Sequence, residues 1–255
     1  MMPLFAGVGV ALVTLFDDDG GLDAPATAAL AGQLVELGVR AVLVAGSTGE
    51  ALALSAEERV SLVRAVRDAL PSGVPVLAGT GAATGVQAAV LTVAAFDAGA
   101  DAALVLSPPR VVDPHSYYDT VADAAGDRPL LAYHYPLASA PGVPVALLPE
   151  LPVTGIKDSS GEPERLLGTL EVFGGAVYTG SATLLSMAGA VGATGAILAL
   201  ANAEPQLCAA AFEGDGKAQR ALLTAHRVAS TDFPTGIKSL VADRFGCSRV
   251  ARLGR

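Results

Sequence analysis

A lysine closes a short β-branched run in residues 153–156, and a polar turn that ends in Gly161 follows it directly. If this run is a strand, the amine of Lys157 stands at the strand's carboxyl end with apolar walls behind it. A lysine partly removed from water has a depressed pKa, and its neutral amine can attack a carbonyl carbon to form a Schiff base. The alternative is a strand-end lysine that pairs with a carboxylate such as Asp158. The segment alone leaves both interpretations open.

A second candidate group is residues 133–136, Tyr-His-Tyr-Pro, at the end of another apolar run. Because side chains alternate along a strand, Tyr133 and Tyr135 share one face and His134 points the other way. A phenol beside a protonated amine has its pKa lowered and can relay protons, which predicts such a role for Tyr133. The alternative for Tyr133 is a tyrosine that only packs the interior. We interpret His134 as structural, because it should face the helices.

Residues 46–50, Gly-Ser-Thr-Gly-Glu, follow a third apolar run. Small residues let the backbone approach a ligand closely, and exposed N–H groups with the hydroxyls of Ser47 and Thr48 can hold a carboxylate. The alternative is an ordinary turn in which Ser47 or Thr48 caps the next helix. Similar small-residue ends occur at residues 79–81 and 179–181.

These segments need a scaffold that brings the carboxyl ends of several strands together. Short apolar runs alternate with amphipathic stretches from end to end, as expected for parallel strands covered on both faces. The predicted strands are residues 8–14, 41–45, 75–79, 102–106, 130–134, 153–157, 176–180 and 195–199.

Helix start signals lie between the predicted strands. Asp23 precedes Pro25 near the first helical position, and Ser55 with Glu58 forms a capping-box pattern. Residues 162–164, Glu-Pro-Glu, open another helix, and two or three further helices are predicted from about residue 205 to residue 245.

Eight strand–helix units predict an α/β fold, a (β/α)8 barrel with additional C-terminal helices. We assign residues 1–203 to the barrel and residues 204–255 to a helical extension packed on it, as a single structural unit. The alternative fold is an open doubly wound sheet, which usually carries a glycine-rich phosphate-binding turn after its first strand. The corresponding turn in this chain, residues 16–20, is acidic and unsuited to phosphate.

Composition restricts the partners. The net charge of −9 argues against nucleic acid and against an anionic membrane surface. Cys208 and Cys247 are too few for a disulfide framework and have no metal spacing, and the three histidines lie far apart, so no metal and no cofactor are expected. The absence of a basic leader pattern favours a cytoplasmic protein.

Residues 172–203 carry no charge and imitate a membrane span. Repeated glycines and Asn202 interrupt the stretch, so we interpret it as a buried strand, a buried helix and a second buried strand. No membrane association is expected.

A barrel mouth with Lys157, Tyr133, Thr48 and Ser47, and without a metal set or a phosphate loop, indicates imine chemistry on a small keto acid. With these residues the chain resembles the dihydrodipicolinate synthase / N-acetylneuraminate lyase superfamily of Schiff-base aldolases. The matching segments run in order through residues 7–14, 46–50, 54–59, 75–81, 99–102, 133–136, 155–161, 192–197 and 201–202.

The resemblance implies that Lys157 forms an imine with pyruvate or a related donor, with Tyr133 as the proton-transferring phenol. It implies that Ser47 and Thr48 hold the keto-acid carboxylate, and that Gly180 and the Ile197 backbone line the pocket. It also implies a homo-oligomer, a dimer or a tetramer.

Three departures from the family pattern bear on the substrate. The loop at residues 107–110 lacks the tyrosine that completes the relay in the synthases, and Tyr117 and Tyr118 lie further along in a predicted helix. Residues 137–140 lack the arginine that binds the aldehyde's carboxylate there, and Arg110 is a candidate replacement. The chain also ends at Arg255, earlier than is usual in the family.

The leading hypothesis is therefore an aldolase or lyase that joins or splits pyruvate and an aldehyde. The alternatives are a dihydrodipicolinate synthase, which joins pyruvate to aspartate semialdehyde, and a non-catalytic barrel that binds 2-oxo acids.

Overall fold

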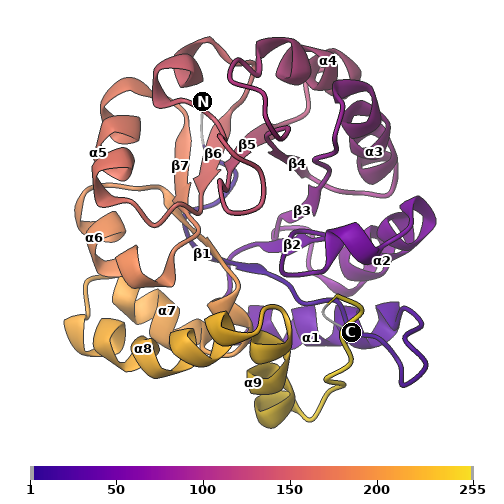
Figure 1. Ribbon diagram of the computed structural model, residues 1–255. Helices are drawn as coiled ribbons and strands as arrows, with labels where there is room; N and C mark the ends of the chain where they lie inside the picture. Colours follow the sequence, from indigo (N-terminus) through magenta and orange to yellow (C-terminus); the bar gives the residue numbers. More distant parts are fainter. Residues whose placement is uncertain (1–2, 254–255) are drawn as a thin grey trace.

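A computed structural model describes residues 3–253, and Figure 1 shows a closed barrel of parallel strands inside a ring of helices. The strands follow one another in chain order, and β8 closes the barrel by pairing with β1. They are β1 (Gly7–Ala11), β2 (Val42–Val44), β3 (Val76–Gly79), β4 (Ala102–Leu106), β5 (Leu130–His134), β6 (Gly155–Asp158), β7 (Ala176–Thr179) and β8 (Gly195–Leu198). The predicted fold class is confirmed.

The helices pack outside the strands, and three of them follow β8, as the sequence predicts. They are α1 (Ala24–Glu36), α2 (Ala56–Ala69), α3 (Gly85–Asp97), α4 (His115–Ala125), α5 (Pro163–Val172), α6 (Leu185–Ala190), α7 (Pro205–Phe212), α8 (Gly216–Thr231) and α9 (Thr235–Phe245), with short 3-10 turns η1 (Ala51–Ala53), η2 (Val145–Glu150), η3 (Ala182–Leu184) and η4 (Leu200–Asn202). The division at residue 203 stays a prediction.

Two helix starts follow the predicted capping chemistry. The Ser55 hydroxyl accepts from the Glu58 N–H at 3.2 Å, and the Glu58 carboxylate accepts from the Ser55 N–H at 2.9 Å. Asp23 accepts from the Ala26 N–H at 2.9 Å before α1. Both side chains satisfy N–H groups that have no partner inside the helix.

The regular alternation fails once, because the crossover from β5 to β6 contains η2 instead of an α-helix. Proline lacks the N–H that an α-helix needs and restricts the residue before it. The crossover carries prolines at positions 136, 141, 144, 149 and 152. The expectation of eight complete strand–helix units is therefore wrong at this one unit.

The first strand is shorter than predicted and ends at Ala11. Beyond it the Leu12 N–H still donates to the Leu43 carbonyl, but the Val13 N–H donates to the side chain of Asn202 at 3.0 Å. The Asn202 amide in turn donates to the Ala11 carbonyl at 2.7 Å. A side chain thus replaces the strand ladder at the carboxyl end of the barrel.

The uncharged residues 172–203 begin at the last residue of α5 and contain β7, η3, α6, β8 and η4, which agrees with the predicted strand, helix and strand. In the described part of the chain, no helix is long and apolar enough to cross a membrane.

The barrel interior is a separate apolar cluster of residues that point inward from the strands. Its buried members are Phe5, Ala11, Ala41, Leu43, Leu77, Ala102, Leu104, Leu131, Tyr133, Tyr178 and Ile197. At the amino end, Tyr178 stacks on Phe5 with ring centres 4.6 Å apart and donates to the Phe5 carbonyl. Side chains therefore fill the barrel at the amino ends of the strands, which leaves the carboxyl ends for a site.

Candidate active site

Strand register directs Lys157 into the barrel. Lys157 pairs with Tyr133 on β5 and with Tyr178 on β7, and both tyrosines belong to the interior cluster. Lys157 is only 5% exposed, and burial lowers its pKa to about 7. A large share of the amine is therefore neutral and nucleophilic near neutral pH.

Asp158 does not pair with Lys157, so that alternative is wrong. Asp158 occupies the opposite face of β6, where it accepts a hydrogen bond from Arg165 at 2.7 Å. Within residues 3–253, Lys157 takes part in no ion pair. The strand alternation that separates the two charges is what leaves the amine free.

His134 lies beside Asp158 on the outer face, as predicted. Its Nδ1 accepts from the Val143 N–H at 2.9 Å, and burial lowers the pKa of His134 to about 4. A neutral imidazole that accepts a backbone hydrogen bond fits the structural interpretation.

Tyr133 lies against the lysine, with the amine 4.5 Å from the ring centre. Tyr135 stacks on Tyr133 at 5.8 Å, which confirms that the two phenols share a face. The expected lowering of the Tyr133 pKa is wrong: burial raises it, and hydrogen bonds from Ser159 and Ser47 only partly offset this. The phenol consequently stays protonated at neutral pH and is a proton donor.

Gly180 lies directly behind the lysine. A methyl group added there would overlap the Ser159 hydroxyl and lie 3.1 Å from Lys157 Cε. Ser159 comes from the turn after β6, where its N–H donates to the His134 carbonyl. Ser159 is not among the predicted site residues, although it stands two residues after Lys157 and therefore on the same face of the chain.

The loop at residues 46–50 is held in a strained conformation. Ala45 and Glu50 have φ values of 51° and 55°, in the left-handed region that side chains disfavour. Thr48 is buried, Ser47 faces a cavity, and Thr14 donates to the Gly49 carbonyl at 2.7 Å.

The Glu50 carboxylate anchors this loop to the other end of the chain. Glu50 forms a fully buried ion pair with Lys238 of α9 and accepts from the N–H groups of Arg252 and Leu253, both at 2.7 Å. Arg252 also binds Glu58 through both terminal nitrogens. Residues 248–253 are named the closing segment below.

A cavity of about 430 Å³ opens where β2 to β5 end. Its wall includes Ser47, Tyr133 and Tyr135, and it also includes Phe233 and Leu253 from beyond the barrel. Nothing local in the sequence could have selected the last two, since only the fold brings them to this mouth.

The remaining residues named from the sequence lie in different surroundings. Ile197 is 1% exposed in the interior cluster with Tyr133. Arg110 is exposed in the loop after β4. It does not line the cavity, and neither do Lys157, Thr48, Gly180 and Ile197. Tyr117 and Tyr118 lie in α4 as predicted, with hydroxyls that donate to backbone carbonyls.

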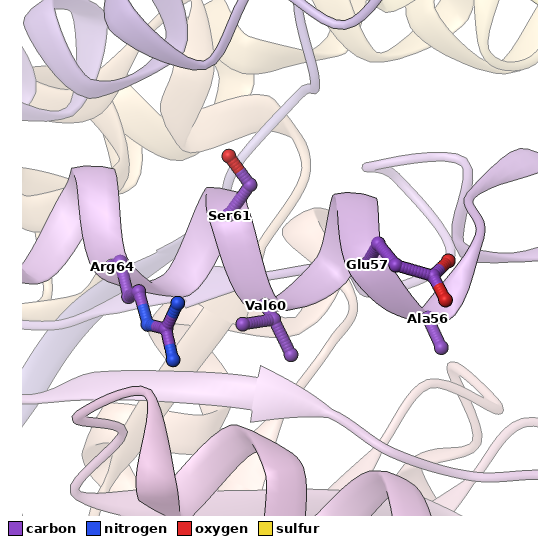
Figure 2. A pocket seen from close by; sticks show the side chains of 5 residues that line it. All are labelled: Ala56, Glu57, Val60, Ser61 and Arg64. Atoms are coloured by element: carbon purple, nitrogen blue, oxygen red, sulfur yellow. The ribbon is translucent and has the colours of Figure 1, made fainter.

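A second hollow has a different character. Figure 2 shows that it runs along α2, with Glu57, Val60 and Arg64 on successive turns. All its lining residues belong to this one helix, and none is a predicted site residue. Among residues 3–253, no cluster of three or more histidine, cysteine or carboxylate side chains is placed to hold a metal ion.

Comparisons with known proteins agree with this geometry. The chain is 35% identical over 233 residues to the 4-hydroxy-tetrahydrodipicolinate synthase of Pseudomonas aeruginosa, covering 86% of this chain and 80% of that one. It is 37% identical over 233 residues to the enzyme of the same name from Synechococcus sp., covering 86% and 77%. The solved structure of YagE, a prophage protein of the dihydrodipicolinic acid synthase family from E. coli K12 in complex with pyruvate, superposes with a TM-score of 0.91 at 27% identity, covering 99% of this chain and 93% of that chain.

The barrel, the unpaired lysine at its mouth and these relatives define a lyase of the aldolase type. The sequence model of the Dihydrodipicolinate synthetase family matches residues 4–240. The chain belongs to this family.

Proposed function

We propose that the protein forms an imine between Lys157 and pyruvate, and joins or splits a carbon–carbon bond between pyruvate and an aldehyde. The observation that carries the proposal is the buried, unpaired amine with a pKa of about 7. Two similar solved proteins, YagE and the dihydrodipicolinate synthase of Acinetobacter baumannii, are described in complex with pyruvate, which supports the choice of donor.

The amine adds to the pyruvate carbonyl, and water leaves to give a protonated imine. Loss of a proton from the methyl carbon gives an enamine, whose electron pair forms the new bond to the aldehyde carbon while the aldehyde oxygen takes a proton. Hydrolysis then releases a 4-hydroxy-2-oxo acid and restores the amine. The reverse sequence splits the same compound.

Each neighbouring group has a part in this proposal. Ser47 and Thr48 bind the pyruvate carboxylate, and Tyr133 exchanges protons through the hydroxyls to which it is hydrogen bonded. Gly180 leaves room for the imine, and the Ile197 backbone lines the same space. Arg110 is given no part, because its side chain is exposed in the loop after β4.

The test is intact-protein mass after incubation with pyruvate and borohydride. The chain has three lysines, Lys157, Lys217 and Lys238. One reduced pyruvate adduct should form in wild type and in Lys217→Met, which alters an exposed lysine, and should be missing in Lys157→Met. An adduct that persists in Lys157→Met, or its absence with every 2-oxo acid tried, contradicts the proposal.

The relatives' name supports a second candidate, condensation of pyruvate with aspartate semialdehyde. Consumption of aspartate semialdehyde that depends on pyruvate and on Lys157 would establish it. A non-catalytic 2-oxo-acid-binding barrel would give the adduct without any aldol turnover.

We also propose a cytoplasmic homo-oligomer, dimer or tetramer. The two free cysteines support the compartment. Val86 and Val90, which are 69% and 64% exposed and lie one turn apart on α3, support the burial of this surface by a second copy. Sedimentation of the wild-type protein as a monomer would contradict the assembly.

A further inference from the structure

The loop that carries Ser47 and Thr48 has strained residues on both sides. Ala45 before it and Glu50 at its end both have positive φ values. A residue with a side chain keeps such a conformation only where its surroundings hold it. The arrangement that presents the two hydroxyls therefore depends on contacts from outside the loop.

The closing segment supplies several of these contacts, and they meet at the carboxylate of Glu50. The N–H groups of Arg252 and Leu253 donate to one of its oxygens, both at 2.7 Å. Lys238 pairs with the same carboxylate, and its amine also donates to the Val250 carbonyl at 2.6 Å. These bonds to Glu50 form only while this part of the closing segment stays in place.

The side chain of Arg252 fastens the closing segment to the carboxyl face of the barrel. Its Nε donates to the Gly20 carbonyl at 2.7 Å, and one terminal nitrogen donates to the Ala53 carbonyl at 2.9 Å. Both terminal nitrogens bind the Glu58 carboxylate, at 2.8 and 2.6 Å. The guanidinium also lies 4.3 Å from the ring centre of the buried Phe16. One side chain thus joins the closing segment to the loops after β1 and β2 and to the start of α2.

The closing segment contains a second arginine, Arg249, with different partners. Its guanidinium donates to the Ser239 hydroxyl at 2.8 Å and to the Asp243 carboxylate. Both partners belong to α9, and the Arg249 side chain is 58% exposed. Arg249 therefore offers a control that has the same charge and lies in the same segment.

We propose that Arg252 is a positioning residue for the binding of pyruvate. It holds the closing segment against Glu50, and this contact fixes the 46–50 loop so that Ser47 and Thr48 can bind the carboxylate of pyruvate. The inference rests on the proposed function, because it assigns a support to the same site. The Lys157 amine should keep its reactivity, since β6 is held by its backbone pairing with β5 and β7.

The test measures borohydride trapping of pyruvate on the full chain, as a function of pyruvate concentration and pH. In Arg252→Met the half-saturating pyruvate concentration should rise at least about tenfold, because a misplaced loop binds the carboxylate poorly. The trapping rate at saturating pyruvate should stay within about twofold of wild type, and its pH dependence should not shift. Arg249→Met should behave as wild type.

Glu58→Gln provides a second variant that removes the ion pair from the other side. Its amide oxygen can still accept from the Ser55 N–H that Glu58 binds in wild type. The half-saturating concentration should rise in this variant as well. The double variant with Arg252→Met should bind pyruvate no worse than Arg252→Met alone, because both changes break the same contact. Urea denaturation identifies the variants that are folded, and Glu58→Gln carries the test if Arg252→Met is not.

Three results would overturn the inference. They are an unchanged half-saturating concentration in the folded variants, an equal rise in Arg249→Met, and a loss confined to the rate at saturating pyruvate. In each of these cases the wild-type adduct still forms, so the proposed function stands. Absence of the adduct in wild type contradicts the proposed function itself, and this inference with it.

Discussion

Replacing Lys157 by methionine is expected to stabilise the folded protein, although it removes the group on which the proposed chemistry depends. Burial lowers the pKa of Lys157 to about 7 in the folded state, whereas an unfolded chain holds a lysine near about 10.4. Between these two values the unfolded state binds one proton more, so the wild-type free energy of unfolding rises with pH. Below about pH 7 both states are protonated, and the cost of the buried lysine is at its maximum.

The magnitude follows from the difference between the two pKa values. The cost of the buried amine is roughly 4–5 kcal/mol at pH 6 to 7 and declines to about 2 kcal/mol at pH 9. Methionine has a similar length and no charge, so Lys157→Met should gain most of this amount at low pH and progressively less as the pH rises.

Urea denaturation of wild type, Lys157→Met and Lys217→Met at pH 6, 7, 8 and 9 measures the effect. The difference between wild type and Lys157→Met should shrink by about 2 kcal/mol from pH 7 to pH 9, while Lys217→Met, an exposed position, should follow wild type. A difference that does not change with pH, or a Lys157→Met protein less stable than wild type at pH 6, would refute the assignment of a depressed lysine pKa.

Three further predictions concern the supports of the site. Gly180→Ala should slow borohydride trapping of pyruvate at least about tenfold, because the added methyl overlaps Ser159 and crowds the lysine; an unchanged trapping rate would show that the lysine has room to move. Asn202→Ala should lower the free energy of unfolding by about 2–3 kcal/mol, since it leaves buried backbone groups at the end of β1 without partners; a loss under about 0.5 kcal/mol would contradict this. Lys238→Met should cost about 3–5 kcal/mol, because the buried Glu50 carboxylate loses its ion-pair partner, and adding Glu50→Gln should restore part of the loss in urea denaturation; a double variant no more stable than Lys238→Met would contradict this.

The chemistry-bearing residues on the strands could be predicted from the sequence for a simple reason. Alternation fixes which side chains point inward, and the carboxyl ends of parallel strands meet in a barrel. These two rules were enough to place Tyr133 with Lys157 and to turn His134 away. The capping pattern at Ser55 is predictable for a different reason, because it depends only on neighbours along the chain.

The features that sequence reasoning missed depend on the whole fold. The pKa of Tyr133 rises because the completed barrel removes water from the phenol, and no local pattern reports that burial. Phe233 and Leu253 reach the cavity from segments that carry no catalytic pattern. Arg110 was a reasonable candidate by position along the chain, but its side chain is exposed outside the cavity wall.

The contact between Glu50 and the closing segment has a consequence for how the protein is made. The carboxylate of Glu50 binds backbone groups more than 200 residues further along the chain. Because synthesis runs from the amino terminus, the loop that carries Ser47 and Thr48 is made long before the backbone N–H groups of Arg252 and Leu253 that hold it. A product broken off before residue 252 would hold every strand of the barrel, yet its 46–50 loop would lack two hydrogen bonds and its cavity would lack the wall that Leu253 provides. The supported 46–50 loop and the complete cavity wall therefore form only after synthesis has passed residue 253.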